Sequence, residues 1–334
     1  MAERKVSYNR MNKKRHHYVP KAYLKFFCDS EGMVRVYLKD DPDKPFQLSP
    51  DNVAFHKYYY SQPLPGGGKD HNRLEDVFSA LEGKWPPIVE RILVRKEVNG
   101  ELEDIFSFMA LQRARVPATR DAAEKMLAEM VKATASVLDA AGELPPKPEG
   151  YEDILDSAQV SIDPHQSIHA MVSIIQGMEY VFGQIGIGSL HNTTDIPFLT
   201  SDNPVIWFDP SVPETSMRPY ALRPDGPIVL LFPVSPQLMI YGHSSMHDPF
   251  ARYGFRHGDL PKRASVKMMN RQICRFAYRA VFAQGVGQEE VIRKHAALSP
   301  VLRSHAVSVD GGALSFNEYV FGKRERKPKW EDYG

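Results

Sequence analysis

The chain has 334 residues, of which 43% are hydrophobic and 25% are charged, and its formal net charge is +1. This composition excludes bulk disorder, and the length allows one large domain or two smaller ones. No apolar run approaches the roughly 20 residues that a membrane-spanning helix needs, and the first residues are too polar for a signal peptide. We therefore expect a cytoplasmic protein with no membrane partner.

Basic residues gather at both ends of the chain. The first 25 residues contain one acidic residue, Glu3, and these basic ones: Arg4, Lys5, Arg10, Lys13, Lys14, Arg15, Lys21 and Lys25. Such clusters neutralise phosphates, although many charged tails are only solvated. We expect a flexible basic arm at 1–14 that attracts RNA or DNA, a single domain at 15–322 and a charged tail at 323–334.

The spacing of apolar residues predicts helices with strands between them. Pro20 suits the first turn of a short helix, and residues 33–38 alternate as a strand does. Helical spacing recurs in five segments: 72–94, 105–116, 118–141, 165–182 and 264–282. Pro86 and Pro87 should split or kink the first of these helices. Strand-like runs occur at 196–200, 205–208, 228–232 and 237–241. We expect an α+β fold that is predominantly helical, with helices packed around a small, mostly antiparallel sheet.

Polar side chains interrupt the apolar helix faces, and burying a polar group is costly unless it finds partners. Gln112 and Arg113 continue the spacing of Ile105 and Met109, so the same face carries them inward. A buried arginine needs a carboxylate, a carbonyl or a phosphate. The pair is therefore either a structural salt bridge in the core or part of a binding site.

Three further helix residues are candidates of the same kind. Asn270 interrupts the stripe of the last helix, where an amide orients a ligand or ties two backbone segments together. Glu75 and Glu82 are seven residues apart and lie along one edge of the 72–94 helix. They are candidate carboxylate partners for Arg113, although a solvated helix flank has the same pattern.

Two other segments carry candidate catalytic groups. His16 and His17 approach Pro20 in an extended conformation, so their side chains point to opposite faces. One of them suits a general acid or base, while the alternative is a core histidine. Ser201 and Asp202 follow an apolar run, which makes Asp202 a candidate metal ligand or orienting acid. Ser, Asp and Asn before proline are also ordinary turn formers.

Motifs of several enzyme classes are missing. The chain contains no Gly-rich phosphate loop, GxSxG elbow or HExxH helix, which disfavours the standard hydrolases, kinases and zincins.

Five segments, in this order, resemble motifs of the domain-of-unknown-function 4238 family: RHHYVPKAYLKFF at 15–27, FMALQRARVPATR at 108–120, FLTSDNPV at 198–205, FPVSPQLMIYG at 232–242 and MNRQICRFAYRAVFA at 269–283. The resemblance selects His16, His17, Gln112, Arg113, Ser201, Asp202 and Asn270. The activity of the family is not established. Some members resemble single-gene anti-phage defence proteins, which implies a nuclease or a sensor.

These residues predict one shared site in an enzyme that cleaves phosphodiester bonds in RNA or DNA, in anti-phage defence. One of His16 and His17 would be the general acid or base, and Asp202 would orient it or bind a divalent metal ion with it. Arg113 would hold phosphate, and the three residues that position the substrate would be Gln112, Ser201 and Asn270. The alternative is a non-enzymatic sensor or interaction protein that binds a nucleotide or nucleic acid.

Overall fold

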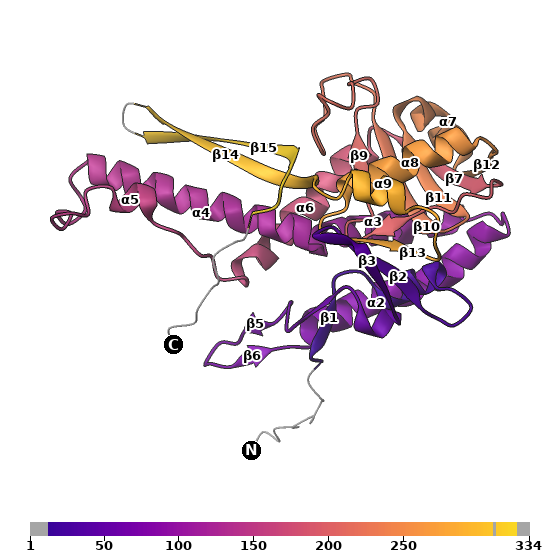
Figure 1. The fold of residues 1–334 in the computed structure, drawn as a ribbon, viewed down its shortest axis with the longest axis horizontal. Helices are drawn as coiled ribbons and strands as arrows, with labels where there is room; N and C mark the ends of the chain where they lie inside the picture. The colour runs from indigo at the N-terminus through magenta and orange to yellow at the C-terminus, as the bar shows by residue number, and fades with distance from the viewer. Residues whose placement is uncertain (1–12, 310–311, 326–334) are drawn as a thin grey trace, which may run out of the picture.

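The computed structural model describes residues 13–309 and 312–325 (Figure 1). Most of the expected N-terminal arm and C-terminal tail lies outside the described residues. Helices hold 40% of the residues and strands 24%, and the described strands form five separate sheets. The fold is therefore mixed α+β, and the expectation of a predominantly helical fold around one small sheet is wrong. None of the described helices is long and apolar enough to cross a membrane.

The helices of the described chain are α1 (Lys21–Leu24), α2 (Arg73–Leu93), α3 (Leu102–Arg115), α4 (Pro117–Ala140), α5 (Ile154–Ser157), α6 (Gln166–Phe182), α7 (His247–Tyr253), α8 (Arg263–Phe276) and α9 (Glu289–Lys294). Helix α2 runs without a break through Pro86 and Pro87, so the expected split is wrong. The buried side chains of Trp85, Ile88 and Val89 hold both halves against the core, which offsets the lost backbone hydrogen bonds.

The helix predicted at 264–282 is shorter in the structure, because α8 ends at Phe276 and residues 280–283 form a strand. Lys39 explains the end point. Its buried ammonium group donates to the carbonyl oxygens of Cys274 and Ala277, at 2.9 and 2.8 Å. A cation that binds the last carbonyl groups satisfies the C-terminus of a helix, so the chain leaves the helix there. No pattern near Phe276 shows this distant partner.

The strands of the described chain are β1 (Arg15–His17), β2 (Val34–Leu38), β3 (Asp41–Leu48), β4 (Phe55–Lys57), β5 (Gln62–Pro63), β6 (Lys69–Asp70), β7 (Gly186–Asn192), β8 (Thr200–Ser201), β9 (Ile206–Phe208), β10 (Val229–Ser235), β11 (Leu238–His243), β12 (Arg256–Leu260), β13 (Ala280–Ala283), β14 (Ser299–Val309) and β15 (Gly312–Gly322). One sheet has the order β12-β7-β11-β10-β9, and another has the order β3-β2-β13-β8. The larger sheet is antiparallel except for the parallel pair of β12 and β7. The second sheet joins the two ends of the domain, because β13 pairs with β2.

The β14–β15 hairpin lies along α4 and extends with it away from the body of the molecule (Figure 1). No element is predicted from the sequence for this part of the chain. The two strands pair in register from Ser299 with Gly322 to Val309 with Gly312. This long hairpin and the second sheet are the main reasons why the strand content exceeds the prediction.

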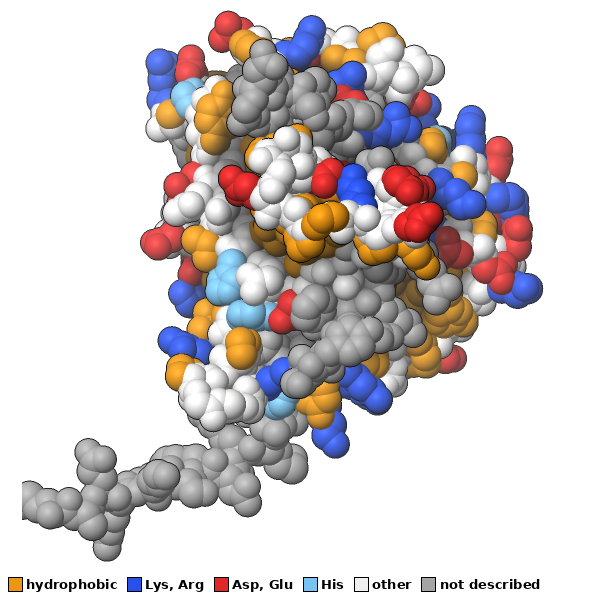
Figure 2. Space-filling model, turned by 90° about the vertical axis from the view of Figure 1, so that its left-hand side faces the viewer, with side chains coloured by type: hydrophobic (Ala, Val, Ile, Leu, Met, Phe, Trp, Pro, Cys, Tyr) orange, Lys and Arg blue, Asp and Glu red, His pale blue; other side chains and the backbone are white. Residues whose placement is uncertain are grey.

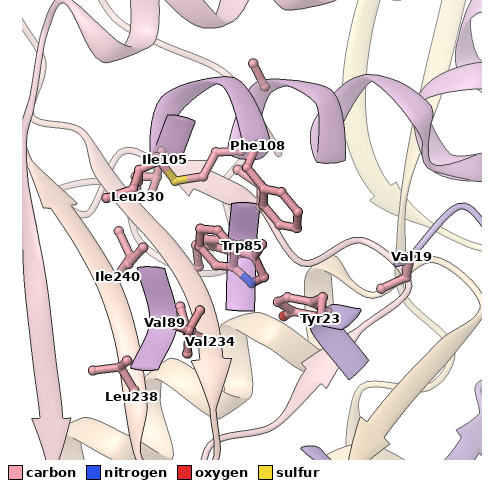
Figure 3. Packing of buried hydrophobic residues seen from close by; sticks show 14 of the residues in the cluster. Val19, Tyr23, Trp85, Val89, Ile105, Phe108, Leu230, Val234, Leu238 and Ile240 are labelled. Atoms are coloured by element: carbon pink, nitrogen blue, oxygen red, sulfur yellow. The ribbon is translucent and has the colours of Figure 1, made fainter. Parts of the chain in front are cut away.

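The main core lies between the larger sheet and helices α1, α2 and α3 (Figure 3). Trp85 of α2 stacks on Phe108 of α3, with 4.1 Å between the ring centroids. Tyr23 of α1 stacks on Phe232 of β10, at 5.4 Å. All of β10 is buried, as expected for a central strand that is covered on both faces. This packing fixes α3 over the sheet and directs its C-terminal turn toward β9.

Candidate functional site

The junction of α3 and α4 buries several polar side chains. Val116, between the two helices, has the extended backbone that is typical before proline, and Pro117 begins α4. The almost fully buried polar residues of this junction are Gln112, Arg113, Arg115, Thr119 and Arg120. Each of them must find partners inside the protein, because an unpaired buried charge is expensive.

Arg115 is neutralised by a carboxylate. Its Nη1 lies 2.6 Å from Oε1 of Glu82, and its Nη2 donates to Oε1 of Gln112 at 3.3 Å. Gln112 in turn donates to the backbone oxygen of Tyr18 at 2.9 Å. Glu75 belongs to the same neighbourhood. Burial raises the pKa of Glu75 to about 7, and the nearby Arg115 opposes that rise. Glu75 and Glu82 of α2 therefore lie near Arg115 and are not partners of Arg113.

Arg120 is held by neutral groups. Its Nε donates to Oγ of Ser167 at 3.0 Å, and its Nη1 donates to the backbone oxygen of Tyr59 at 2.5 Å. Its Nη2 donates to the backbone oxygen of Pro164. The ring of Tyr59 lies 4.0 Å from the guanidinium carbon. These contacts tie α4 to the start of α6 and to the segment after β4.

Arg113 has neither a carboxylate partner nor a full set of neutral hydrogen-bond acceptors in the described part of the chain. Its Nη1 donates to the hydroxyl of Thr119, and its buried Nε, like that of Arg115, has no hydrogen-bond partner. The ion pairs of the described residues do not include it. Instead, the guanidinium carbon lies 3.9 Å from the ring centroid of Tyr220 and 5.5 Å from that of Trp207. Arg113 is a buried cation in an aromatic box, with only 3% of its surface exposed.

Further unpaired polar atoms surround this box. Nε1 of Trp207 and Oδ1 of Asn203 are buried without a hydrogen-bond partner. The amide nitrogen of Asn203 donates to the hydroxyl of Tyr220 at 2.6 Å, which places Asn203 beside the same ring. Buried polar atoms are rarely left unpaired in folded proteins, so several of them around one guanidinium make this neighbourhood a candidate site.

The loop at 209–227 covers Arg113 through Tyr220. Tyr220 has a φ of 60° and Asp225 a φ of 56°, in the left-handed region that residues other than glycine seldom adopt. Such strained positions persist only where surrounding contacts impose them, and they are frequent at ligand clamps and switches. Tyr220 is partly exposed, whereas Arg113 beside it is buried.

His16 is fully buried and both of its ring nitrogens are engaged by backbone groups. Its Nε2 donates to the carbonyl oxygen of Lys13, and its Nδ1 accepts from the backbone N–H of Tyr60, each at 2.9 Å. Burial lowers the pKa of His16, which favours the neutral ring that these contacts require. His16 therefore ties β1 to the segment after β4 and has no nitrogen left for a substrate.

His17 points to the other side of β1 and is partly exposed. Its Nε2 is buried without a partner. Burial, followed by the positive charge of Lys21, lowers the pKa of His17 to about 4. Of the two histidines, His17 is thus the one whose ring nitrogen remains available.

Asp202 is fully buried, and backbone groups occupy both of its carboxylate oxygens. Oδ1 accepts from the N–H of Tyr278 at 2.8 Å, and Oδ2 accepts from the N–H of Arg279 at 2.7 Å. Burial raises the pKa of Asp202, and these two hydrogen bonds oppose the rise. Ser201 accepts from the N–H of Asn203 at 3.1 Å. Both side chains thus make the contacts of a structural turn that fixes the segment between α8 and β13.

Asn270 also binds backbone groups. Its Oδ1 accepts from the N–H of Leu199 at 3.0 Å, and its Nδ2 donates to the carbonyl oxygen of Pro197 at 2.8 Å. The same Nδ2 donates to Oε1 of Gln288 at 2.7 Å. The amide therefore fixes the segment before β8 against α8.

The selected residues do not all meet in one site. Arg113 and Asp202 share a neighbourhood, because Tyr220 lies within electrostatic range of both. His16 and Asn270 are bound elsewhere, to the segment after β4 and to the segment before β8. In the described part of the chain, no group of three or more His, Cys, Asp and Glu side chains has an arrangement that could hold a metal ion.

Three residues around Arg113 carry no sequence signal of a site: Asn203, Trp207 and Tyr220. Asn203 lies in the same turn as Asp202, where an amide before proline is an ordinary turn former. Trp207 lies in a buried strand, where an aromatic residue is ordinary. Tyr220 lies in a loop without periodicity, so no sequence pattern singles it out.

The fold and this junction define a mixed α+β protein with an incompletely neutralised arginine in its core. Residues 15–285 match the profile of a family described as a protein of unknown function, DUF4238. The match covers most of the chain, so the protein belongs to this family, and the resemblance inferred from the five motifs is confirmed. No curated protein and no solved structure matches the chain.

Proposed function

We propose that the protein is a sensor that binds a nucleotide or another phosphorylated ligand at Arg113. The observation that carries this proposal is the buried guanidinium, which lies against Tyr220 and Trp207 without a carboxylate partner. A phosphate group would supply the missing acceptors, because guanidinium binds phosphate through parallel hydrogen bonds. The unpaired N–H of Trp207 would be a further donor to the same anion.

The aromatic residues suit the rest of such a ligand. Bases stack on aromatic rings and on arginine planes, and each stacked base contributes about 1–3 kcal/mol. A ligand that enters beneath Tyr220 would displace its ring from Arg113 and would contact the guanidinium group in place of that ring. The strained backbone of Tyr220 would favour this exchange, since opening the loop releases the strain.

On the face shown in Figure 2, the charge pattern favours a small ligand over a long nucleic acid. On this face, Lys and Arg side chains are interspersed with Asp and Glu side chains and form no continuous basic stripe. Binding along a nucleic-acid backbone needs clustered positive charge. Binding of RNA or DNA through the basic arm remains a prediction, since residues 1–12 lie outside the described part of the chain.

Phosphodiester cleavage also remains a prediction, and the geometry favours it less. His16 and Asp202, the expected acid or base and its partner, use their polar atoms for backbone hydrogen bonds. Proton transfer requires a group within hydrogen-bond reach of the substrate, and His17 alone of these residues keeps an unpaired nitrogen.

Isothermal titration calorimetry with ATP and with inorganic pyrophosphate tests the proposed binding. We expect saturable binding by the wild type and loss of at least tenfold in affinity in Arg113→Met, because the charge-assisted hydrogen bonds disappear (about 1.5–3 kcal/mol). Arg252→Met, which removes an exposed arginine on α7, is the matched control and should bind like the wild type. Equal binding by Arg113→Met and the wild type would rule out the site.

A cleavage assay separates the two functions. Labelled RNA and DNA are incubated with the wild type and with His17→Gln, with Mg²⁺, with Mn²⁺ and with a chelator. The sensor proposal predicts intact nucleic acid under all conditions. Cleavage that His17→Gln abolishes would instead establish the nuclease and overturn the proposal of a sensor.

A further inference from the structure

A second cavity lies between α8 and α9, which lie side by side (Figure 1). Its volume is about 600 Å³, within the usual range for pockets that hold small molecules. Its wall includes the apolar side chains of Ile196, Met268 and Val291. None of these residues contacts Arg113, so the cavity is separate from the site proposed above.

Two amide side chains that line the cavity are held by hydrogen bonds. Asn270 donates to Gln288 at 2.7 Å, and Gln288 donates to the carbonyl oxygen of Pro197 at 2.6 Å. Both amides line the cavity, and these hydrogen bonds restrain them. Side chains that are already restrained lose little entropy when they bind a ligand. This role accounts for the inward position of Asn270 on α8.

One buried polar group in the cavity lacks a partner. His295 lines the cavity and is 7% exposed, and its Nε2 is buried without a hydrogen-bond partner. Burial, followed by the positive charge of Arg275, lowers the pKa of His295 to about 4, so the ring is neutral near pH 7. A neutral ring nitrogen in this position can bind a hydroxyl or a protonated oxygen of a ligand.

Positive charge lines the walls of the cavity. Arg263 and Arg271 are neutralised by Asp195 and Glu214, at 2.7 and 2.9 Å. Lys267 of α8 and Lys294 of α9 also line the cavity and form no ion pair among the described residues. Both are exposed. The carboxylate of Glu290 also lines the cavity. These two lysines and this one carboxylate leave an excess of positive charge.

We infer that the α8–α9 cavity binds a small organic oxyanion, with its phosphate or carboxylate between Lys267 and Lys294, a polar oxygen on His295 and its apolar part against Met268. Lysine binds such groups as a point charge, and the apolar wall adds burial of the remaining ligand surface. This inference does not rest on the function proposed for Arg113. It assigns a second binding site to the protein.

Calorimetric titrations with ADP, inorganic pyrophosphate and citrate test the inference and distinguish phosphate from carboxylate. We expect at least one of them to bind, and the double variant Lys267→Gln/Lys294→Gln to weaken this binding by about tenfold or more. The control Lys96→Gln/Lys262→Gln loses the same charge from exposed positions outside the cavity and should bind like the wild type. His295→Phe keeps the volume of the ring and should also lose affinity.

Hydrogen exchange locates the bound probe. Binding in the cavity should protect amides of α9 and of the first turns of α8, whereas binding at Arg113 should protect the loop at 209–227. Absence of saturable binding of all three probes at millimolar concentrations would overturn the inference. So would unchanged affinity in the double lysine variant, or protection confined to the 209–227 loop.

Discussion

Three arginines of the α3–α4 junction are buried to a similar degree but are stabilised in different ways. Arg115 has the carboxylate of Glu82, Arg120 has two carbonyl oxygens and a hydroxyl, and Arg113 has a hydroxyl and two aromatic faces. A buried cation–π contact contributes about 2 kcal/mol, whereas desolvation of an ion costs several kcal/mol. Burial of the Arg113 guanidinium therefore destabilises the free protein on balance, and a bound anion would offset this destabilisation.

This difference predicts opposite effects of two matched substitutions on stability. Arg115→Met leaves Glu82 without its cation and should lower the free energy of unfolding by about 3 kcal/mol. Arg113→Met removes a cation that has no carboxylate partner. It should lower the free energy of unfolding by less than about 1 kcal/mol, or raise it. Urea unfolding at pH 7 measures both. A loss in Arg113→Met as large as that in Arg115→Met would show that Arg113 is purely structural.

Glu214 makes several of the contacts that hold the 209–227 loop to α8. The carboxylate accepts from Nε2 of Gln272 at 2.9 Å and pairs with Arg271 at 2.9 Å. The backbone oxygen of Glu214 accepts from Arg275 at 2.8 Å. The loop therefore connects the cover of Arg113 with Arg271, a residue that lines the α8–α9 cavity.

Glu214→Gln should loosen this loop without unfolding the domain, because it removes the charge of the ion pair and keeps the side-chain volume. We expect faster amide hydrogen exchange at 209–227 and unchanged exchange in β10 and β11. Glu290→Gln, a change of the same type on exposed α9, is the control. Equal protection of the loop in Glu214→Gln and the wild type would show that other contacts hold it.

At the scale of the whole molecule, buried titratable groups set the pH range of stability. Burial lowers the pKa values of His17 and His295 to about 4, from about 6.5 in the unfolded chain. Between these values the unfolded state binds protons that the folded state does not bind. The stability that these two histidines contribute is therefore fully present above about pH 6.5 and is lost as the pH falls toward 4.

Thermal unfolding measured from pH 4 to pH 8 checks this expectation. The wild type should lose stability below about pH 6.5, and His295→Phe should lose less over the same interval because one of the two histidines no longer titrates. The exposed His247 offers the control His247→Gln, which should follow the wild type. An identical pH dependence in His295→Phe and the wild type would contradict the assignment of the buried neutral ring.

The family and the inward direction of several polar residues follow from patterns along the chain. The inward positions of Gln112, Arg113 and Asn270 follow from helical periodicity, and each is at most 3% exposed. Periodicity is a local property, so a helix face can be read before the fold is known. The bounds of α4 and α6 lie within one residue of the predicted ones for the same reason.

The partners of these residues depend on how distant segments of the chain pack together. Glu82 lies against Arg115, two residues from the predicted contact, and Arg113 meets Trp207 and Tyr220 from a strand and a loop about a hundred residues away. The second sheet and the end of α8 also depend on contacts between distant segments. Such contacts are set by long-range strand pairing and loop packing, which leave no local pattern in the chain.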